Sequence, residues 1–178
     1  MAPISAIEFG VRAANIRLLL FDVDGVLTDG SVNVDATGRD IQRFYIRDGA
    51  AMVWAQRAGL MTGVLSGRAS DATSARAKDL NMAVIALGVT DKRAAFTDIL
   101  KQHHLAAEEV AYMGDDLIDL PVLREAGLSA APADAAPEVS AVTHFVAWHP
   151  GGNGAVREFI EAVLKARGQW DDVLASFA

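Results

Sequence analysis

Short apolar runs alternate with longer segments of helical spacing along most of this chain. Each run is almost continuously hydrophobic, which is typical of strands covered on both faces in a parallel sheet. The five runs are Arg17–Phe21, Met61–Leu65, Met82–Leu87, Val110–Met113 and Leu128–Ala131. The helical segments are Gly49–Ala58, Arg68–Leu80, Lys92–His104, Leu117–Ala126 and Gly154–Arg167, the last stopped by Gly168. We therefore predict an α/β fold with a doubly wound, Rossmann-like parallel sheet.

One segment interrupts this alternation. Ser31–Ile46 begins with alternating side chains, passes through a turn-like Asp35–Gly38, and returns to residues of high β-propensity at Phe44–Ile46. This pattern predicts a β-hairpin. It follows the first strand directly, where open α/β sheets place their ligand crevice. The hairpin would therefore cover the crevice or pair with another subunit.

Length and charge limit the classes of protein to be considered. The chain has 178 residues, which fits one domain over 1–178 with a hairpin flap at about 29–47 and a C-terminal tail at about 169–178. Its formal net charge is −7, so there is no basic surplus for nucleic acid or an anionic membrane as the main partner. The lack of cysteine excludes thiolate metal sites. Residues 1–15 lack the pattern of a signal peptide, and we expect a cytoplasmic protein.

Carboxylates follow two of the predicted strands where those strands end. Asp22 and Asp24 follow the first, and alternation puts them on the same side; Asp115, Asp116 and Asp119 follow the fourth. A lone acidic pair is equally typical of a polar turn, and one aspartate of the second group would serve as a helix cap, but a cap needs only one carboxylate. If the two strands are neighbours, their carboxyl ends bring these oxygens together. Oxygen ligands of this kind suit Mg²⁺.

A hydroxyl and an ammonium follow two further strands. Ser66 comes after Met61–Leu65, and its structural alternative is to cap a helix that begins near Arg68. Lys92 opens a helix, although the helix dipole mildly disfavours a lysine in the first turn. Each residue alone carries little information. Together with the acids, they place a polar group after each of four successive strands.

This set of groups resembles the haloacid dehalogenase-like (HAD) phosphatases. FDVDGVLTDG, LSGR, Lys92 and GDDLID are similar to the four motifs of that family, in the family's order. The resemblance implies an HAD-like fold without a large cap domain, because only the Asp29–Arg47 hairpin separates the first two motifs. More narrowly, the hairpin, Arg47-Asp48-Gly49 and the late GGNGAVRE resemble the branch of the family that acts on phosphorylated 2-keto-3-deoxy sugar acids.

The resemblance implies two chemical roles at the first motif. Asp22 would attack phosphorus and become an aspartyl phosphate, which splits hydrolysis into two steps. Asp24 would protonate the leaving sugar alkoxide and then deprotonate the water that cleaves the aspartyl phosphate.

The other motif residues are implied to hold the metal and the phosphate. The implied Mg²⁺ ligands are Asp22, the Asp24 backbone carbonyl and Asp115. Asp116 and Asp119 would orient metal waters or the Lys92 ammonium. Ser66 and Lys92 would bind the non-bridging phosphate oxygens and stabilise charge in the transition state.

Substrate selection is implied to involve a second subunit. An uncapped site is open to water unless a neighbour closes it, and hairpins assemble a homotetramer in the resembled branch. Guanidinium groups would pair with the carboxylate of a sugar acid. The positions implied near the substrate are Asp24, Tyr45, Ile46, Arg47, Asp48, Gly49, Arg68, Arg76 and Lys92. The structural alternatives are that Asp48 caps a helix beginning at Gly49, and that Arg68 and Arg76 are solvated.

The resemblance implies Mg²⁺-dependent hydrolysis of 3-deoxy-D-manno-octulosonate 8-phosphate (KDO 8-phosphate) to KDO and phosphate, in lipopolysaccharide precursor synthesis. A nine-carbon keto-sugar-acid phosphate is the alternative substrate, since Val53 and Asn153 stand where the family often carries basic residues. The alternative from another class is a phospho-accepting receiver domain. In receivers the lysine comes last, whereas here GDDLID follows Lys92, and this order favours the hydrolase.

Aromatic residues suggest two smaller expectations. Gln169–Ala178 either docks into a neighbouring site through Trp170 or Phe177, or frays. Trp54 and Trp148 are interpreted as packing residues and not as a binding box.

Overall fold

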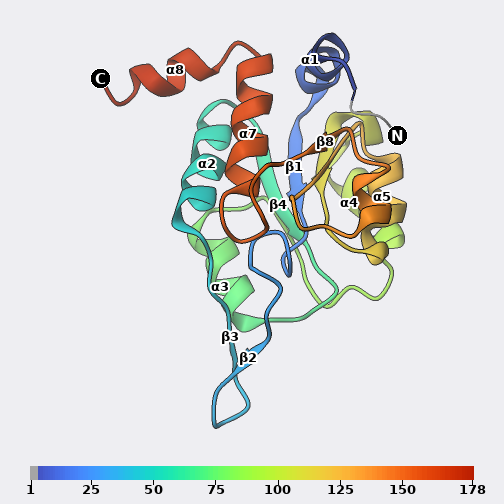
Figure 1. Ribbon diagram of the computed structural model, residues 1–178, viewed down its shortest axis with the longest axis vertical. Coiled ribbons are helices and arrows are strands. Elements are labelled where there is room, and N and C mark those ends of the chain that lie inside the picture. Colours follow the sequence, from blue (N-terminus) through green and yellow to red (C-terminus); the bar gives the residue numbers. More distant parts are fainter. Residues whose placement is uncertain (1–3) are drawn as a thin grey trace.

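A six-stranded, fully parallel sheet forms the centre of the computed structural model, which describes residues 4–178 (Figure 1). The strands are β1 (Leu18–Phe21), β4 (Met61–Leu65), β5 (Val84–Ala86), β6 (Val110–Met113), β7 (Leu128–Ala131) and β8 (Phe145–Val146). Their order in the sheet is β5-β4-β1-β6-β7-β8, so β1 lies between β4 and β6. This confirms the doubly wound α/β class, without a large cap domain.

Helices cover both faces of the sheet, which explains why the strands are mostly apolar. One layer contains α1 (Ala6–Asn15), α2 (Ile46–Arg57), α3 (Asp71–Asp79) and α7 (Ala155–Ala166). The other contains α4 (Lys92–His103), α5 (Leu120–Glu125) and α6 (Pro137–Ser140). Along β1, Leu19 and Phe21 pack into the first layer, while Leu18 and Leu20 pack into the second. Because β1 is buried on both faces, the backbone of Asp22, the residue that follows it, is held in a fixed position.

Most predicted elements are confirmed, and the differences occur at their ends. The predicted strand Met82–Leu87 is shorter as β5, because the Met82 amide donates to Ala77 O and closes the turn after α3. The segment Leu117–Ala126 divides into a 3₁₀ turn, η2 (Leu117–Asp119), and α5. A second 3₁₀ turn, η1 (Ala107–Glu109), precedes β6. Gly168 ends the last long helix at φ +69°. No prediction was made for α1, α6 or the two-residue β8.

The hairpin projects from the sheet edge at which the strands end (Figure 1). Its strands are β2 (Asn33–Val34) and β3 (Asp40–Ile41), joined by a turn in which Gly38 adopts φ +82°. The expectation that strand structure returns at Phe44–Ile46 is wrong. Phe44 packs against the core, and α2 already begins at Ile46, three residues before the predicted start at Gly49.

The C-terminal tail folds back onto α2 as a short helix, α8 (Trp170–Ala175), so fraying is not what the structure shows. Trp54 lies edge-on to both Trp170 and Phe177, with ring centroids 5.8 and 6.0 Å away. The interpretation of Trp54 as a packing residue is confirmed. The same interpretation of Trp148 as a packing residue is wrong, because this side chain is 90% exposed. Across residues 4–178, helices with the length and apolarity needed to cross a membrane are absent.

Candidate active site

The candidate site lies where three neighbouring strands end. Phe21 pairs with Val64 on one side and with Met113 on the other, so β1, β4 and β6 end at nearly the same level. Asp22, Ser66 and Asp115 therefore emerge together at the carboxyl edge of the sheet. In doubly wound folds, this edge is where ligands bind.

Three carboxylates form a compact cluster at this edge. One oxygen each from Asp22, Asp115 and Asp119 lies within 4.8 Å of the other two. Gly25 makes the close approach possible: it adopts φ +86°, and a Cβ atom there would lie 2.1 Å from Asp115 Oδ2. A side chain at position 25 would therefore force Asp115 away from its position.

Lys92 crosses from the start of α4 to neutralise part of this cluster. Its Nζ atom lies 2.8 Å from Asp22 Oδ1 and 2.6 Å from Asp119 Oδ1, and all three side chains are buried. The buried Tyr112 hydroxyl also donates to Asp119 Oδ1 at 2.6 Å. Asp119 Oδ2 accepts from the backbone amides of Asp115 and Asp116 at 3.1 and 3.2 Å. Asp119 thus ties the ammonium to the loop that carries Asp115 and Asp116.

Burial and mutual repulsion perturb the protonation of this cluster. Burial, followed by the charge of Asp119, raises the pKa of Asp22 to about 6, although Lys92 counteracts both. Burial and the charges of Asp22 and Asp119 raise the pKa of Asp115 to about 8. For Lys92, burial lowers the pKa, but the neighbouring Asp22 and Asp119 outweigh it and leave the pKa raised. The single positive charge of Lys92 therefore does not neutralise the three carboxylates.

The unbalanced charge fits a divalent cation. Asp115 Oδ1 is buried and has no hydrogen-bond partner among residues 4–178, which is costly for a carboxylate oxygen unless a ligand satisfies it. The donors at the cluster are oxygens only, and hard oxygen donors suit Mg²⁺. Asp22 and Asp115 lie close enough to share one ion.

Removal of one carboxylate is expected to stabilise the metal-free protein at high pH. The folded-state pKa of Asp115 is about 8 against an ordinary value of 3.8, so the folded protein retains a proton that the unfolded chain has lost. This stabilising contribution is fully present below pH 3.8 and is lost progressively as pH rises from there to about 8. In urea unfolding with a chelator at about pH 8.5, Asp115→Asn should be more stable than wild type by about 1 to 2 kcal/mol, allowing for partial solvent screening.

The same comparison at about pH 5 is the control, since the two proteins should then differ little. The free energy of unfolding of the metal-free wild type should fall, relative to that of Asp115→Asn, between about pH 5 and 8.5. A rise would contradict the claim that the three carboxylates repel one another.

Asp24 lies beside this cluster and is held by side chains from elsewhere in the chain. Its Oδ1 atom accepts from Arg68 Nη1 at 2.9 Å and from Gln42 Nε2 at 3.2 Å. Arg68 Nη2 also pairs with Asp40, at 3.1 Å. Gln42, Asp40 and Tyr112 were not predicted, because no local pattern marks a polar residue whose partner lies far along the chain.

A cavity of about 260 Å³ opens over these groups. It is lined by Asp22, Asp24, Gly30, Ser66, Gly67, Arg68, Asp115, Asp116 and Ile118. The alternative in which Ser66 caps the next helix is wrong, because Ser70 caps α3, and within residues 4–178 the hydrogen bond to Ser66 Oγ comes from the nearby Arg68 amide. Asp116 does act as a cap, for the turn η2, and Asp119 accepts from the Asp116 amide in the same capping box, so capping contacts involve two of the three acids.

The remaining predicted substrate positions lie outside this cavity in the single chain. Tyr45 and Arg47 line a second cavity of about 230 Å³, next to the start of α7. A third, small cavity is lined by Asp48 and Gly49 of α2 together with Arg76 of α3. The side chain of Ile46 is exposed.

The structural alternative for Asp48 also needs correction. Asp48 Oδ1 accepts from the Arg157 amide at 2.8 Å, so it caps α7 and not a helix beginning at Gly49. Of the predicted arginines, the structure brings only Arg68 to the acids.

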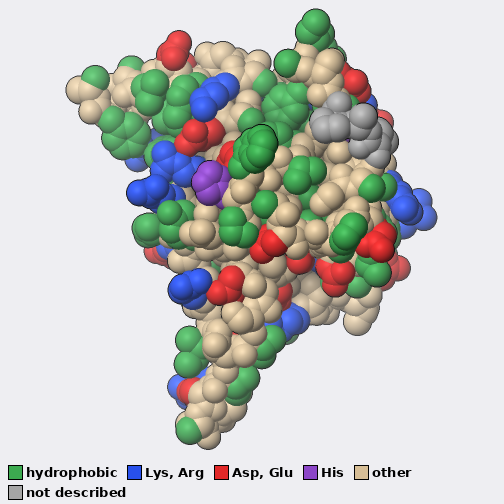
Figure 2. All heavy atoms as spheres, viewed as in Figure 1, with side chains coloured by type: hydrophobic (Ala, Val, Ile, Leu, Met, Phe, Trp, Pro, Cys, Tyr) green, Lys and Arg blue, Asp and Glu red, His purple; other side chains and the backbone are tan. Residues whose placement is uncertain are grey.

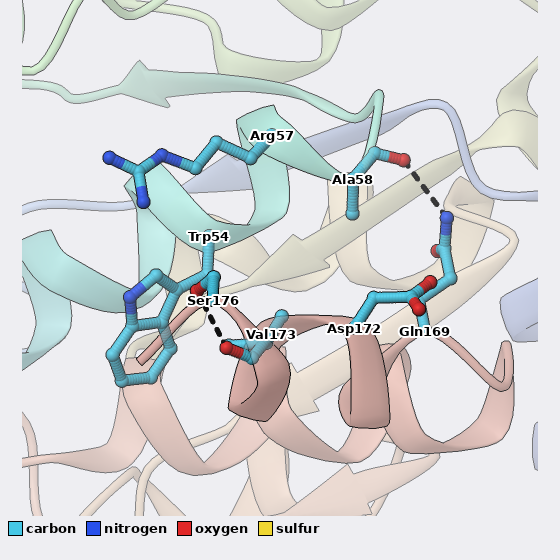
Figure 3. A pocket seen from close by; sticks show the side chains of 7 residues that line it. All are labelled: Trp54, Arg57, Ala58, Gln169, Asp172, Val173 and Ser176. Atoms are coloured by element: carbon cyan, nitrogen blue, oxygen red, sulfur yellow. Dashed lines mark hydrogen bonds between the residues drawn. The ribbon is translucent and has the colours of Figure 1, made fainter. Parts of the chain in front are cut away.

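Another cavity, of about 280 Å³, lies between α2 and α8 (Figure 3). Trp54, Arg57 and Val173 are among the side chains that line it, and Asp172 is its single carboxylate. It contains no residue of the acidic cluster. Of these two cavities, the one at the strand ends therefore has the clustered carboxylates that a metal-dependent reaction needs.

Comparisons with known proteins agree with this geometry. Residues 58–160 match a family model described as haloacid dehalogenase-like hydrolase. The chain is 39% identical over 170 residues to the 3-deoxy-D-manno-octulosonate 8-phosphate phosphatase of Escherichia coli K12, covering 96% of this chain and 90% of that protein. The Haemophilus influenzae protein of the same name is 42% identical over 159 residues, covering 89% and 88% of the two chains. The chain belongs to the haloacid dehalogenase-like hydrolases.

Within this family, the solved structures point to one kind of phosphatase. The chain is similar to the crystal structure of 3-deoxy-D-manno-octulosonate 8-phosphate phosphatase from Moraxella catarrhalis with magnesium, phosphate and KDO (TM-score 0.93, 34% identity, 96% of this chain and 98% of that one). A cobalt-bound structure from Haemophilus influenzae is also similar (TM-score 0.86, 40% identity, 89% and 93%). These relatives favour the hydrolase over the receiver interpretation.

Proposed function

We propose that this chain is a Mg²⁺-dependent phosphatase that hydrolyses KDO 8-phosphate to KDO and inorganic phosphate. The observation that carries the proposal is the meeting of Asp22, Ser66, Lys92 and Asp115 at the ends of neighbouring strands. The similarity to phosphatases of this name supports the substrate. We propose that the reaction serves lipopolysaccharide precursor synthesis and takes place in the cytoplasm.

Asp22 is the proposed nucleophile. Its carboxylate follows a strand buried on both faces, and the Asp22 amide donates to Met113 O at 2.9 Å, which fixes its position. Lys92 lies 2.8 Å from Oδ1 and favours the ionised form that can attack phosphorus. Attack forms a bond from a carboxylate oxygen to phosphorus and breaks the bond from phosphorus to the sugar oxygen.

Asp24 is the proposed acid and base. In the first step it gives its proton to the departing sugar oxygen, and in the second it takes a proton from the water that attacks the aspartyl phosphate. Its place in the lining of the cavity, on the wall shared with Arg68, allows it to reach the leaving group.

The remaining groups bind and balance charge. The Asp22 and Asp115 carboxylates and the Asp24 backbone carbonyl would hold Mg²⁺, which offsets the repulsion between the phosphate and the carboxylates and polarises the phosphoryl group. Ser66 and Lys92 would donate to non-bridging phosphate oxygens. Asp119 orients Lys92, and Asp116 shapes the loop that carries Asp115.

A panel of phosphate monoesters tests the proposed reaction. The panel contains KDO 8-phosphate, a nine-carbon keto-sugar-acid phosphate and hexose phosphates, and phosphate release is measured with and without Mg²⁺. We expect the highest kcat/KM for KDO 8-phosphate, and only with the metal. A preference for the nine-carbon or hexose compounds would contradict the substrate assignment. Absence of Mg²⁺-dependent release from the whole panel would contradict the phosphatase itself.

The proposed assembly is a homotetramer formed through the hairpins. Val32 and Val34 are 63% and 60% exposed on the projecting hairpin, where Figure 2 shows hydrophobic side chains around its sides. An exposed apolar strand pair is an aggregation hazard unless a partner covers it. A neighbouring copy would also close the open cavity and would give Arg47 and Arg76 a role in a site that they do not reach in their own chain.

Charges on the hairpin are expected to dissociate this assembly. Val32→Glu combined with Val34→Glu should shift the mass measured by light scattering from a tetramer towards smaller species, because like charges would be buried at the interface. Ala36→Glu adds a negative charge in the exposed turn, away from the two valines, and should leave the mass unchanged. A wild-type monomer, or a tetrameric double variant, would contradict assembly through the hairpins.

A further inference from the structure

We propose that Gln42 is a positioning residue, which fixes the carboxyl group of Asp24 for proton transfer to the leaving group. The inference rests on the proposed function, because it assumes that Asp24 is the acid of a phosphatase. Gln42 directly follows β3 at the base of the hairpin and is half-buried. It is absent from the lining of the acidic cavity, so its influence on the substrate must pass through Asp24.

The amide of Gln42 joins Asp24 to the start of α3. Its Nε2 atom donates to Asp24 Oδ1 at 3.2 Å. Its Oε1 atom accepts from the hydroxyls of Ser70, at 2.9 Å, and Thr73. Ser70 and Thr73 are both buried, so the far end of the amide is fixed to a rigid helix terminus.

These contacts determine which end of the amide faces Asp24. Ser70 Oγ accepts from the Thr73 amide and donates its own proton to Gln42 Oε1. A reversed amide could still donate to the two hydroxyl oxygens, but it would place a carbonyl oxygen against an Asp24 carboxylate that has no proton to offer when ionised. The surroundings thus favour the orientation that offers an N–H to Asp24.

Gln42 and Arg68 converge on the same oxygen of Asp24. Both donate to Oδ1, and among residues 4–178 no hydrogen bond to Oδ2 is seen. The carboxyl group is therefore held by one oxygen and leaves the other for proton exchange. Because Arg68 lines the cavity and can meet the substrate itself, Gln42 is the residue that isolates the orienting effect.

The experiment compares two substrates that differ in their need for an acid. An alkyl phosphate such as KDO 8-phosphate releases a strongly basic alkoxide that must be protonated, whereas 4-nitrophenyl phosphate releases a stable phenolate. For both, kcat/KM reports steps up to phosphoryl transfer to Asp22. We expect Gln42→Leu to lower kcat/KM at least about tenfold for KDO 8-phosphate and less than about twofold for 4-nitrophenyl phosphate.

Two further variants make the result specific. Gln42→Glu retains the acceptor for Ser70 and Thr73 but loses the donor to Asp24, and it should behave like Gln42→Leu. Gln102→Leu makes the same change at an exposed glutamine of α4, away from the hairpin, and should match the wild type on both substrates.

The possible outcomes separate the inference from the proposed function. Equal losses on both substrates would show a general structural role for Gln42, and no loss on either would show that Asp24 needs no such support; both results overturn the inference. A wild-type enzyme that hydrolyses neither phosphate would instead overturn the proposed function.

Discussion

Asp22→Asn is expected to reduce phosphate release by about 10⁴-fold or more, the scale seen when a nucleophile is removed. An amide oxygen is a far weaker nucleophile than a carboxylate and cannot form the aspartyl phosphate. The substitution also removes the negative charge that faces Lys92 at 2.8 Å. Turnover of KDO 8-phosphate at saturating Mg²⁺ measures the loss.

This result must be separated from unfolding. Asp22 is one of three crowded carboxylates, and replacing it with a neutral group of similar shape relieves repulsion, so thermal unfolding should show a folded protein. Asp98→Asn is a matched control, because Asp98 is an exposed aspartate on α4. If folded Asp22→Asn retained the turnover of that control, Asp22 would not be the nucleophile.

Asp24→Ala is expected to lower kcat for KDO 8-phosphate by about 10² to 10⁴, or about 3 to 5 kcal/mol in the barrier. Both steps lose their proton carrier, and Arg68 and Gln42 lose their common partner. Binding of the metal should persist, because Asp22 and Asp115 are unchanged and Asp24 contributes only its backbone carbonyl.

Calorimetric titration with Mg²⁺ beside the turnover assay separates these effects. We expect nearly wild-type affinity for Mg²⁺ in Asp24→Ala together with the large loss in kcat. Loss of Mg²⁺ binding together with activity would instead make the Asp24 side chain part of the metal site.

The central sheet and its acidic edge were predictable because each depends on local chemistry. A strand buried on both faces is mostly apolar, and β1 and β4 end directly before a polar side chain, at Asp22 and Ser66. Parallel strands that end together bring those groups to one edge, so the proximity of Asp22 and Asp115 was expected if their strands are neighbours, as β1 and β6 are.

Contacts between distant segments could not be predicted in the same way. The link from Gln42 to Asp24 depends on how the hairpin lies over α3, and Phe44 leaves the strand pattern because the core offers it a packing site. Asp48 looked like a cap for its own helix, but it caps α7, which lies more than a hundred residues further along the chain.

The most direct measurement is to stop the enzyme with acid during turnover of a substrate labelled in its phosphate, and to locate the label by peptide mapping. If the converging carboxylates hold a divalent ion so that one of them accepts the phosphoryl group, the label will be found on Asp22, and only in samples that contained Mg²⁺. The account would be contradicted if the enzyme turned over fully and the label was found on no carboxylate, or on a residue other than Asp22.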